Sequence, residues 1–249
     1  AGCFGTWDET GRHIHLTVLA GAVEGMGYGE ALGRFIAKDG CALPEGAALA
    51  AALAAWATAP TDDPLMPARA ELLQAMQRDD LPAGFHSVTH PHKDFSLTAA
   101  AYRARVPLTV HPGIGYDIIC NHPAANGAAL GRGAYLDYRV FAHGVSQLDK
   151  GVFLSVGSAI MAPQVFEKAM SFANNLRRQQ GLDPVQPFIL VNDLSRVDWD
   201  WSRGEPPQDD PAYYLRFCKS FSRMGGEMIY AGGDNRTLLT NLWATLRDD

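Results

Sequence analysis

A histidine and an aspartate flank a glycine-containing turn, HPGIGYD, near the middle of this sequence. These are His111 and Asp117, and Gly113 and Gly115 lie between them. The apolar run VPLTV just before the turn predicts a buried strand. We therefore expect both side chains at the ligand-binding edge of a sheet, where a carboxylate suits a cationic amine. The alternative explanation is that Asp117 caps the following turn.

Two further turns join a predicted strand to a predicted helix. The first follows GVFLSV and contains Gly157, and the free amides of the next helix suit a phosphate or carboxylate. The second is AGGDNR, whose glycines allow a ligand to approach the backbone closely. In this turn Asp234 suits a ribose hydroxyl, or else Asp234 or Asn235 caps the last helix. The candidate cofactor-binding residues are thus Gly113, Gly115, Gly157, Ser158, Gly232, Gly233, Asp234 and Asn235.

Two other patterns have competing explanations. GMGYGEALG, from Gly25 to Gly33, is similar to a dinucleotide fingerprint, but no strand precedes it, so tight helix packing or a kink is favoured. The loop with His86, His90 and His92 offers three imidazoles of the kind that bind zinc, and it is the basis of an alternative function as a metal-dependent hydrolase. An exposed polar loop is the simpler explanation, and we assign no metal ligands.

Composition excludes several classes of protein. The 249 residues are 47% hydrophobic, with a formal net charge of -6. This modest acidity, without a basic face, argues against nucleic acid as the main partner. No apolar run reaches the roughly 18 residues of a membrane span, and the beginning of the chain lacks a signal-peptide pattern. Four widely spaced cysteines predict reduced thiols in a cytoplasmic protein: Cys3, Cys41, Cys120 and Cys218.

The elements that position these residues alternate between strand and helix. A helical portion covers about residues 8–80: one long helix with glycine breaks in the first forty residues, an alanine-rich helix over 47–59, and a helix beginning near Asp62 or Asp63 and Pro64. The composition of DLPAGFHSVTHPHKD predicts a turn-rich loop. At least four strand-turn-helix units follow, with strands in VPLTVHPG, GVFLSVGS, QPFILVNDL and EMIYAGGDN. This order predicts a single α/β domain over residues 1–249 with a largely parallel sheet.

In their order, these segments resemble deoxyhypusine synthase and its bacterial homologues over nearly the whole chain. The similarity is carried by CFGTWDETGRHI, VPLTVHPGIGYDIICNH, GVFLSVGSAIMAP and IYAGGDN. It implies a Rossmann-like fold with helices on both sides of a mostly parallel sheet, NAD as cofactor, a polyamine-like amine substrate, and a homo-oligomer such as a tetramer. It places Asp117 in the polyamine and cofactor pocket and Gly157 at the strand end that contacts NAD. It also points to Lys219, eleven residues before Tyr230, as the catalytic lysine.

Two departures from the family limit what the resemblance implies. No counterpart of the family's early NAD-binding strands is visible, so the chain is expected to enter the fold partway through. Ala162 and Pro163 stand where the family has a histidine pair, one of which helps to bind spermidine. We therefore expect a homologue that performs NAD-dependent amine oxidation or aminoalkyl transfer on a polyamine-like substrate, whose identity the sequence does not indicate. The expected catalytic residues are Lys219, Asp117 and His111. A non-catalytic ligand-binding relative is the third alternative.

Overall fold

The computed structural model describes residues 5 and 7–248, with only the backbone of Asp248. The contacts divide the chain into two compact units, residues 1–140 and 141–249, where the sequence predicted one domain. Each unit is described by itself below. Cys3 lies outside the described residues, and the other three cysteines are free thiols, as predicted. None of the helices in the described part of the chain is both long enough and apolar enough to cross a membrane.

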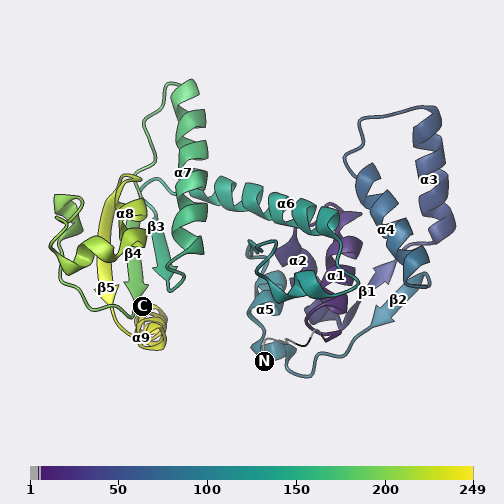
Figure 1. The fold of residues 1–249 in the computed structure, drawn as a ribbon, viewed down its shortest axis with the longest axis horizontal. Coiled ribbons are helices and arrows are strands. Elements are labelled where there is room, and N and C mark those ends of the chain that lie inside the picture. The colour runs from purple at the N-terminus through teal and green to yellow at the C-terminus, as the bar shows by residue number, and fades with distance from the viewer. Residues whose placement is uncertain (1–4, 6, 249) are drawn as a thin grey trace. The chain divides into compact units, whose positions relative to one another are not determined.

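The first unit is mainly helical (Figure 1). Its short strands β1 and β2 pair antiparallel, with Cys41 opposite His86. Its buried core contains Leu16, Phe35 and Leu72, which come from three different helices. The elements are α1 (Arg12–Ala22), α2 (Tyr28–Lys38), β1 (Gly40–Leu43), α3 (Gly46–Thr58), α4 (Met66–Arg78), β2 (Gly84–Ser87), α5 (Leu97–Ala104) and the part of α6 (Gly127–Ser146) up to Val140, with short 3-10 helices at Lys93–Phe95 and Ile118–Asn121.

Several helix predictions in this unit are confirmed and two assignments are wrong. The alanine-rich helix predicted over 47–59 is α3. The long N-terminal helix is instead two helices, α1 and α2, because the chain turns at Gly25 with a left-handed φ of 77°. The segment DLPAGFHSVTHPHKD is not all loop, since it contains β2. Asp63 acts just ahead of α4, where its carboxylate accepts a hydrogen bond from the amide of Leu65.

The predicted buried strand in VPLTVHPG is also wrong, because residues 106–112 form no regular element. The amide of Val110 donates to Oδ2 of Asp137 on α6 at 2.8 Å, and the amide of Gly29 donates to the same oxygen at 2.8 Å. The amide of Val110 thus donates to a side-chain carboxylate, where in a strand it would donate to the backbone of a neighbouring strand. Asp137 is 2% exposed, and burial raises the pKa of its carboxyl group.

Close contacts with Asp137 and with two backbone carbonyls explain three glycines of GMGYGEALG. A Cβ atom at Gly27 would lie 1.9 Å from Oδ1 of Asp137, and one at Gly29 would lie 2.0 Å from the carbonyl oxygen of Leu108. At Gly33 the limit is the carbonyl of Thr98 on α5, at 2.5 Å. The motif therefore serves close packing, and the amino end of α2 holds an internal carboxylate in the position that a phosphate takes in a dinucleotide site.

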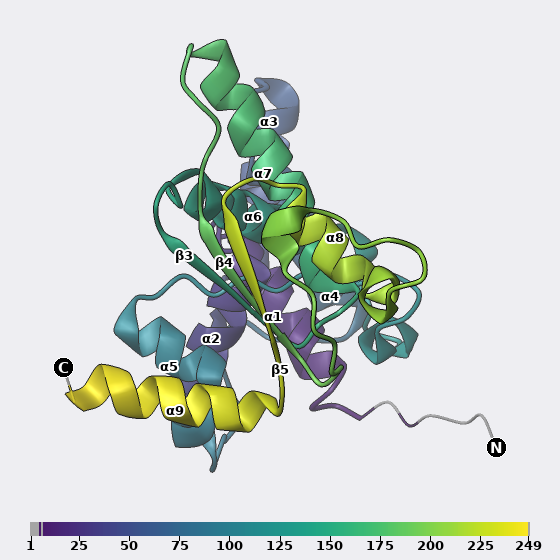
Figure 2. The same ribbon diagram turned by 90° about the vertical axis from the view of Figure 1, so that its left-hand side faces the viewer.

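The second unit is built on a three-stranded parallel sheet in the order β3-β4-β5 (Figure 2). Across the sheet, Leu154 is in register with Leu190, and Leu190 with Ile229. This confirms an α/β fold with a parallel sheet flanked by helices, although the sheet has three described strands where at least four were expected. The elements are β3 (Val152–Val156), α7 (Met161–Gln179), β4 (Phe188–Asp193), α8 (Arg216–Ser222), β5 (Glu227–Gly232) and α9 (Asn235–Asp248), with 3-10 helices at Trp201–Arg203 and Pro211–Tyr214 between β4 and α8.

Helices α7 and α8 cover one face of this sheet through aromatic packing. The ring of Phe153 on β3 lies 4.0 Å from that of Phe166 on α7 and 5.8 Å from that of Phe221 on α8, measured between centroids. Phe166 and Phe221 are fully buried. Because side chains alternate between the two faces of a strand, Phe153 and Ile189 point into a core. The helices packed on this core hold in place the strands whose carboxyl ends carry the candidate site.

Replacing Gly29 by alanine tests the packing role of the glycine motif. The new Cβ would meet backbone, which cannot move aside as a side chain can, so we expect a loss of about 1–3 kcal/mol in the free energy of unfolding. Gly131→Ala is the matched control, because a Cβ added at Gly131 in α6 would have no other atom within 4 Å, and alanine there should stabilise by about 0.5–1 kcal/mol. Urea denaturation followed by circular dichroism measures both, and a Gly29→Ala protein as stable as the wild type would contradict the packing role.

Candidate functional site at the carboxyl edge of the parallel sheet

Three loops meet at the carboxyl edge of the sheet because the strands are parallel and adjacent. They follow Val156, Asp193 and Gly232, where β3, β4 and β5 end. The two turns predicted in this region, after GVFLSV and at AGGDNR, leave the outer strands β3 and β5, and a third loop leaves the central strand β4. The structure therefore brings together Gly157, Ser158 and the residues of AGGDNR at one edge.

Asn192, near the end of the central strand, connects all three loops. Its Nδ2 donates to the carbonyl oxygen of Ala231 at 2.7 Å and to that of Gly233 at 3.4 Å. Its own carbonyl oxygen accepts from the amide of Gly157 at 2.9 Å. The side chain is 2% exposed, and its Oδ1 is buried without a hydrogen-bond partner among the described residues. A buried acceptor left in this state costs about 1–3 kcal/mol, and such atoms in native proteins usually meet water or a ligand.

Asn235, the first residue of α9, presents a second acceptor of the same kind. Its Oδ1 is also buried and lacks a partner within the described part of the chain. A Cβ atom at Gly157 would lie 3.1 Å from Nδ2 of Asn235, which places the first loop directly against the third. Gly157 and Ser158 both have left-handed φ values, 69° and 55°. The tight turn after β3 is thus built for close approach to the asparagine side chain.

The remaining predicted residues of this edge mostly serve the fold. Asp234 caps α9, since its Oδ1 accepts from the amides of Arg236 and Thr237 at 3.1 Å each, and these bonds lower the pKa of its carboxyl group. Oγ of Ser158 accepts from the amide of Ala162 at the start of α7. The amide of Gly233 donates to the carbonyl oxygen of Asp193 at 2.8 Å. Because these amides already donate within the protein, the edge offers acceptors to a ligand more than it offers donors.

The side chains below this edge are buried and closely spaced. The hydroxyl of Tyr230 donates to the carbonyl oxygen of Ser195 at 2.7 Å, and burial, followed by the nearby Asp193 and Cys218, raises its pKa to about 12. Burial also raises the pKa of the Cys218 thiol to about 12. Both groups are therefore protonated at neutral pH, and neither is activated for proton transfer or nucleophilic attack.

Lys219, the predicted catalytic lysine, lies on α8 in an ion pair. Its Nζ is 2.7 Å from Oε1 of Glu205 and 3.2 Å from the centroid of the Tyr213 ring. Only 11% of its side chain is exposed. Arg223 binds the second oxygen of Glu205 at 2.8 Å, and the two cations lower the pKa of that carboxyl group, Lys219 first. These contacts hold the Nζ of Lys219 against Glu205 and Tyr213, whereas a nucleophile must be free to reach its carbon.

The loop HPGIGYD belongs to the first unit and follows no strand, so it is not part of the β3-β4-β5 sheet. Oδ2 of Asp117 accepts from the amide of Gly113 at 2.6 Å, closing its own loop rather than capping the turn after it. Nε2 of His111 lies 3.1 Å from Oγ1 of Thr109, and burial lowers the pKa of its imidazole. Gly115 turns the chain with a φ of 98°. These contacts assign the four residues roles within the loop.

The three histidines behind the hydrolase alternative have separate surroundings. Nε2 of His86 lies 2.7 Å from the carbonyl oxygen of Pro82, and the ring of His90 packs edge-on against Phe35 at 5.2 Å. His92 precedes the 3-10 helix Lys93–Phe95. No three His, Cys, Asp or Glu side chains within residues 5 and 7–248 are grouped so that they would hold a metal ion. The geometry therefore gives no support to a metal centre.

Sequence reasoning missed Asn192, Asp137 and Glu205. A usable signal existed for the first, since Asn192 follows the apolar run FILV directly, where an amide is unusual in a buried strand. Asp137 likewise interrupts the apolar stripe of its helix. Glu205 carries no such signal, because its partner Lys219 is fourteen positions away and the intervening loop has no fixed period.

Reductive methylation tests whether Lys219 is held in its ion pair, because the reaction needs an accessible amine. We expect Lys219 to be labelled much more slowly than Lys168, whose side chain is 65% exposed, as followed by peptide mass spectrometry. Glu205→Gln removes the charge that holds the ammonium and should accelerate labelling at Lys219 and leave Lys168 unchanged. Equal rates at the two lysines in the wild type would instead indicate a free amine, as a nucleophile requires.

In comparisons with known proteins, no family model, curated protein sequence or solved structure matches this chain.

Proposed function

We propose that this chain is a Rossmann-like protein of the deoxyhypusine synthase type that binds NAD at the carboxyl edge of β3, β4 and β5. The observation that carries the proposal is the pair of buried, unpartnered amide oxygens of Asn192 and Asn235, next to the left-handed turn at Gly157. Ligands of open parallel sheets bind beyond the carboxyl ends of the strands. The sequence resemblance supplies the identity of the cofactor.

The residues present fit the nucleoside part of a dinucleotide. Ribose hydroxyls and amide groups are hydrogen-bond donors, and Oδ1 of Asn192 and Oδ1 of Asn235 are acceptors without partners in the described structure. Gly232 and Gly233 leave backbone accessible beside them. The edge offers few hydrogen-bond donors to the pyrophosphate, because the carboxylate of Asp234 already accepts from the first free amides of α9. We therefore assign Asn192 and Asn235 to hydroxyl recognition, and Gly157, Ser158, Gly232 and Gly233 to the surrounding turns.

The proposed reaction is oxidation of an amine on a polyamine-like substrate, followed by aminoalkyl transfer. NAD, when bound, supplies the hydride acceptor for this chemistry. The roles of Asp117 in holding the substrate ammonium and of Lys219 as nucleophile come from the resemblance, as does a homo-oligomer such as a tetramer. The catalytic role of His111 comes from its position in the HPGIGYD loop of the sequence. For Lys219 to act, its ammonium must leave Glu205 and lose a proton, and substitution of Glu205 would favour that step.

A non-catalytic relative that binds the ligand is the second candidate, and the Lys219–Glu205 ion pair favours it. A lysine fixed as an ammonium beside a carboxylate stabilises the loop before α8 and does no chemistry. The two candidates differ in one readout: the enzyme forms NADH fluorescence when NAD and spermidine are added together, and the non-catalytic relative binds NAD without forming NADH.

Calorimetric titration of the full chain with NAD tests the proposed site through Asn235→Ala. Loss of one hydrogen bond should weaken NAD binding about tenfold. The variant should be as stable as the wild type or more so, because it removes a buried acceptor without a partner. Asn241→Ala, an exposed position on the same helix, should change neither quantity.

Two results would contradict the proposal. One is the absence of NAD binding by the wild-type chain. The other is equal NAD affinity in the wild type and in Asn235→Ala.

A further inference from the structure

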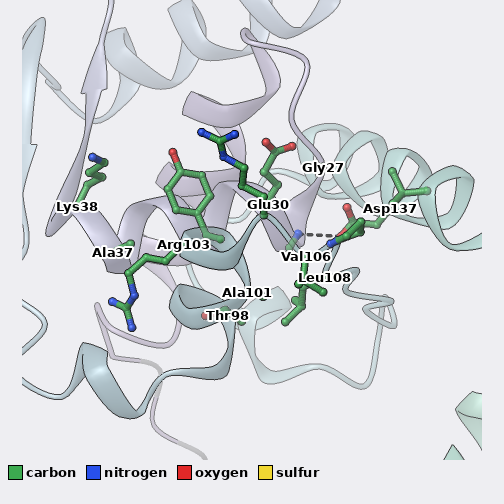
Figure 3. A pocket seen from close by; sticks show the side chains of 15 residues that line it. Gly27, Glu30, Ala37, Lys38, Thr98, Ala101, Arg103, Val106, Leu108 and Asp137 are labelled. Carbon is green, nitrogen blue, oxygen red and sulfur yellow. Dashed lines mark hydrogen bonds between the residues drawn. The ribbon is translucent and has the colours of Figure 1, made fainter. Parts of the chain in front are cut away.

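A pocket of about 810 Å³ lies in the first unit, and none of its lining residues is assigned above to NAD or its chemistry. Its walls come from α2, α5, the segment after α5 and the part of α6 before Phe141, all within residues 1–140 (Figure 3). Its volume is within the range of small-molecule sites. Nothing in the proposed NAD site accounts for it.

The middle of this pocket is apolar. Ala101 on α5 and Ala37 on α2 contribute small side chains, and Val106 and Leu108 contribute larger ones. Val106 is 59% exposed. The segment that carries Val106 and Leu108 is the one diverted from a strand by Asp137, so the same interaction that breaks the strand shapes the pocket.

The two ends of the pocket carry opposite charges. Figure 3 shows Lys38 and Arg103 on one side and Glu30 and Asp137 on the other. Glu30 and Lys38 are eight residues apart on α2, which corresponds to about 12 Å along a helix axis. The charges therefore mark the ends of an elongated space, with the apolar side chains between them.

Arg105 also lines the pocket, so three cations and two acids surround the space. Lys38 and Glu30 are exposed, and no ion pair joins either to another described residue. Arg103 lies 3.7 Å from Asp94, whose side chain is 87% exposed, so that attraction is weak. Asp137 is already engaged, because Gly29 and Val110 both donate to its Oδ2, which leaves Glu30 as the available acid. Both α2 charges also suit the helix dipole, but the dipole does not explain an apolar pocket between them.

We propose that this pocket binds an elongated zwitterion, with its ammonium group at Glu30, its anionic group at Lys38 and Arg103, and an apolar chain across Ala101 and Leu108. With carbon–carbon bonds of about 1.5 Å, a chain of about nine single bonds spans the distance between the charges. A polyamine does not fit the site, because Lys38 and Arg103 repel a second cation. The proposal is independent of NAD binding.

Calorimetric titration of the full chain with 8-aminooctanoate tests the proposal. We expect saturable binding of this probe and much weaker binding of 1,8-diaminooctane and octanedioate, which have the same length and one charge of the wrong sign. Glu30→Gln and Lys38→Gln should each weaken binding of the probe about tenfold. Both positions are exposed, so the variants should keep the helical signal of the wild type, and Lys168→Gln in the second unit serves as the matched control.

Three outcomes would overturn the proposal: no saturable binding of 8-aminooctanoate, equal binding of the diamine or the diacid, or unchanged affinity in Glu30→Gln and Lys38→Gln.

Discussion

The side-chain amide of Asn192 is the interaction on which the second unit's binding edge depends. Its Nδ2 fixes the turn after β5 through two carbonyl oxygens, and its backbone carbonyl fixes the turn after β3 through the amide of Gly157. Because the nitrogen is committed, the oxygen has a defined direction and is the only polar atom of that side chain left for a ligand. One buried residue thus both assembles the edge and leaves a hydrogen-bond acceptor there.

Asp137 has the corresponding place in the first unit. Its carboxylate accepts from Gly29 and Val110, and it requires glycine at position 27 because a Cβ there would overlap its Oδ1. This single group holds the amino end of α2, keeps residues 106–112 out of a strand and leaves Val106 and Leu108 lining a pocket. In both units a buried polar side chain outside the helix and sheet hydrogen bonds determines the shape of a candidate site. This is expected because buried backbone groups need a hydrogen-bond partner, and here the side chain is the partner within reach.

Sequence reasoning succeeded where local pattern and tertiary environment agree. Strands β3, β4 and β5 and helix α7 were found because apolar runs end in glycine or asparagine turns that start a helix. VPLTV has the same apolar character, but apolar character does not reveal whether the amide of Val110 meets a neighbouring strand or the carboxylate of Asp137, twenty-seven positions away. Lys219 was singled out by its spacing from Tyr230 in the family resemblance, and its catalytic role stays a prediction. Its ion pair with Glu205 could not be predicted, since pairing across an irregular loop leaves no periodic pattern in the sequence. The glycines at 157, 232 and 233 were placed correctly at the sheet edge, whereas the HPGIGYD loop was not.

A crystal structure of the full chain grown with NAD tests the central claim most directly. We expect electron density for the dinucleotide over residues 231–236, with a hydroxyl or amide group within about 2.7–3.2 Å of Oδ1 of Asn192 and of Oδ1 of Asn235. Density for NAD at the amino end of α2, beside the glycines of GMGYGEALG, would contradict this claim. An edge that holds only water at saturating NAD would contradict it as well.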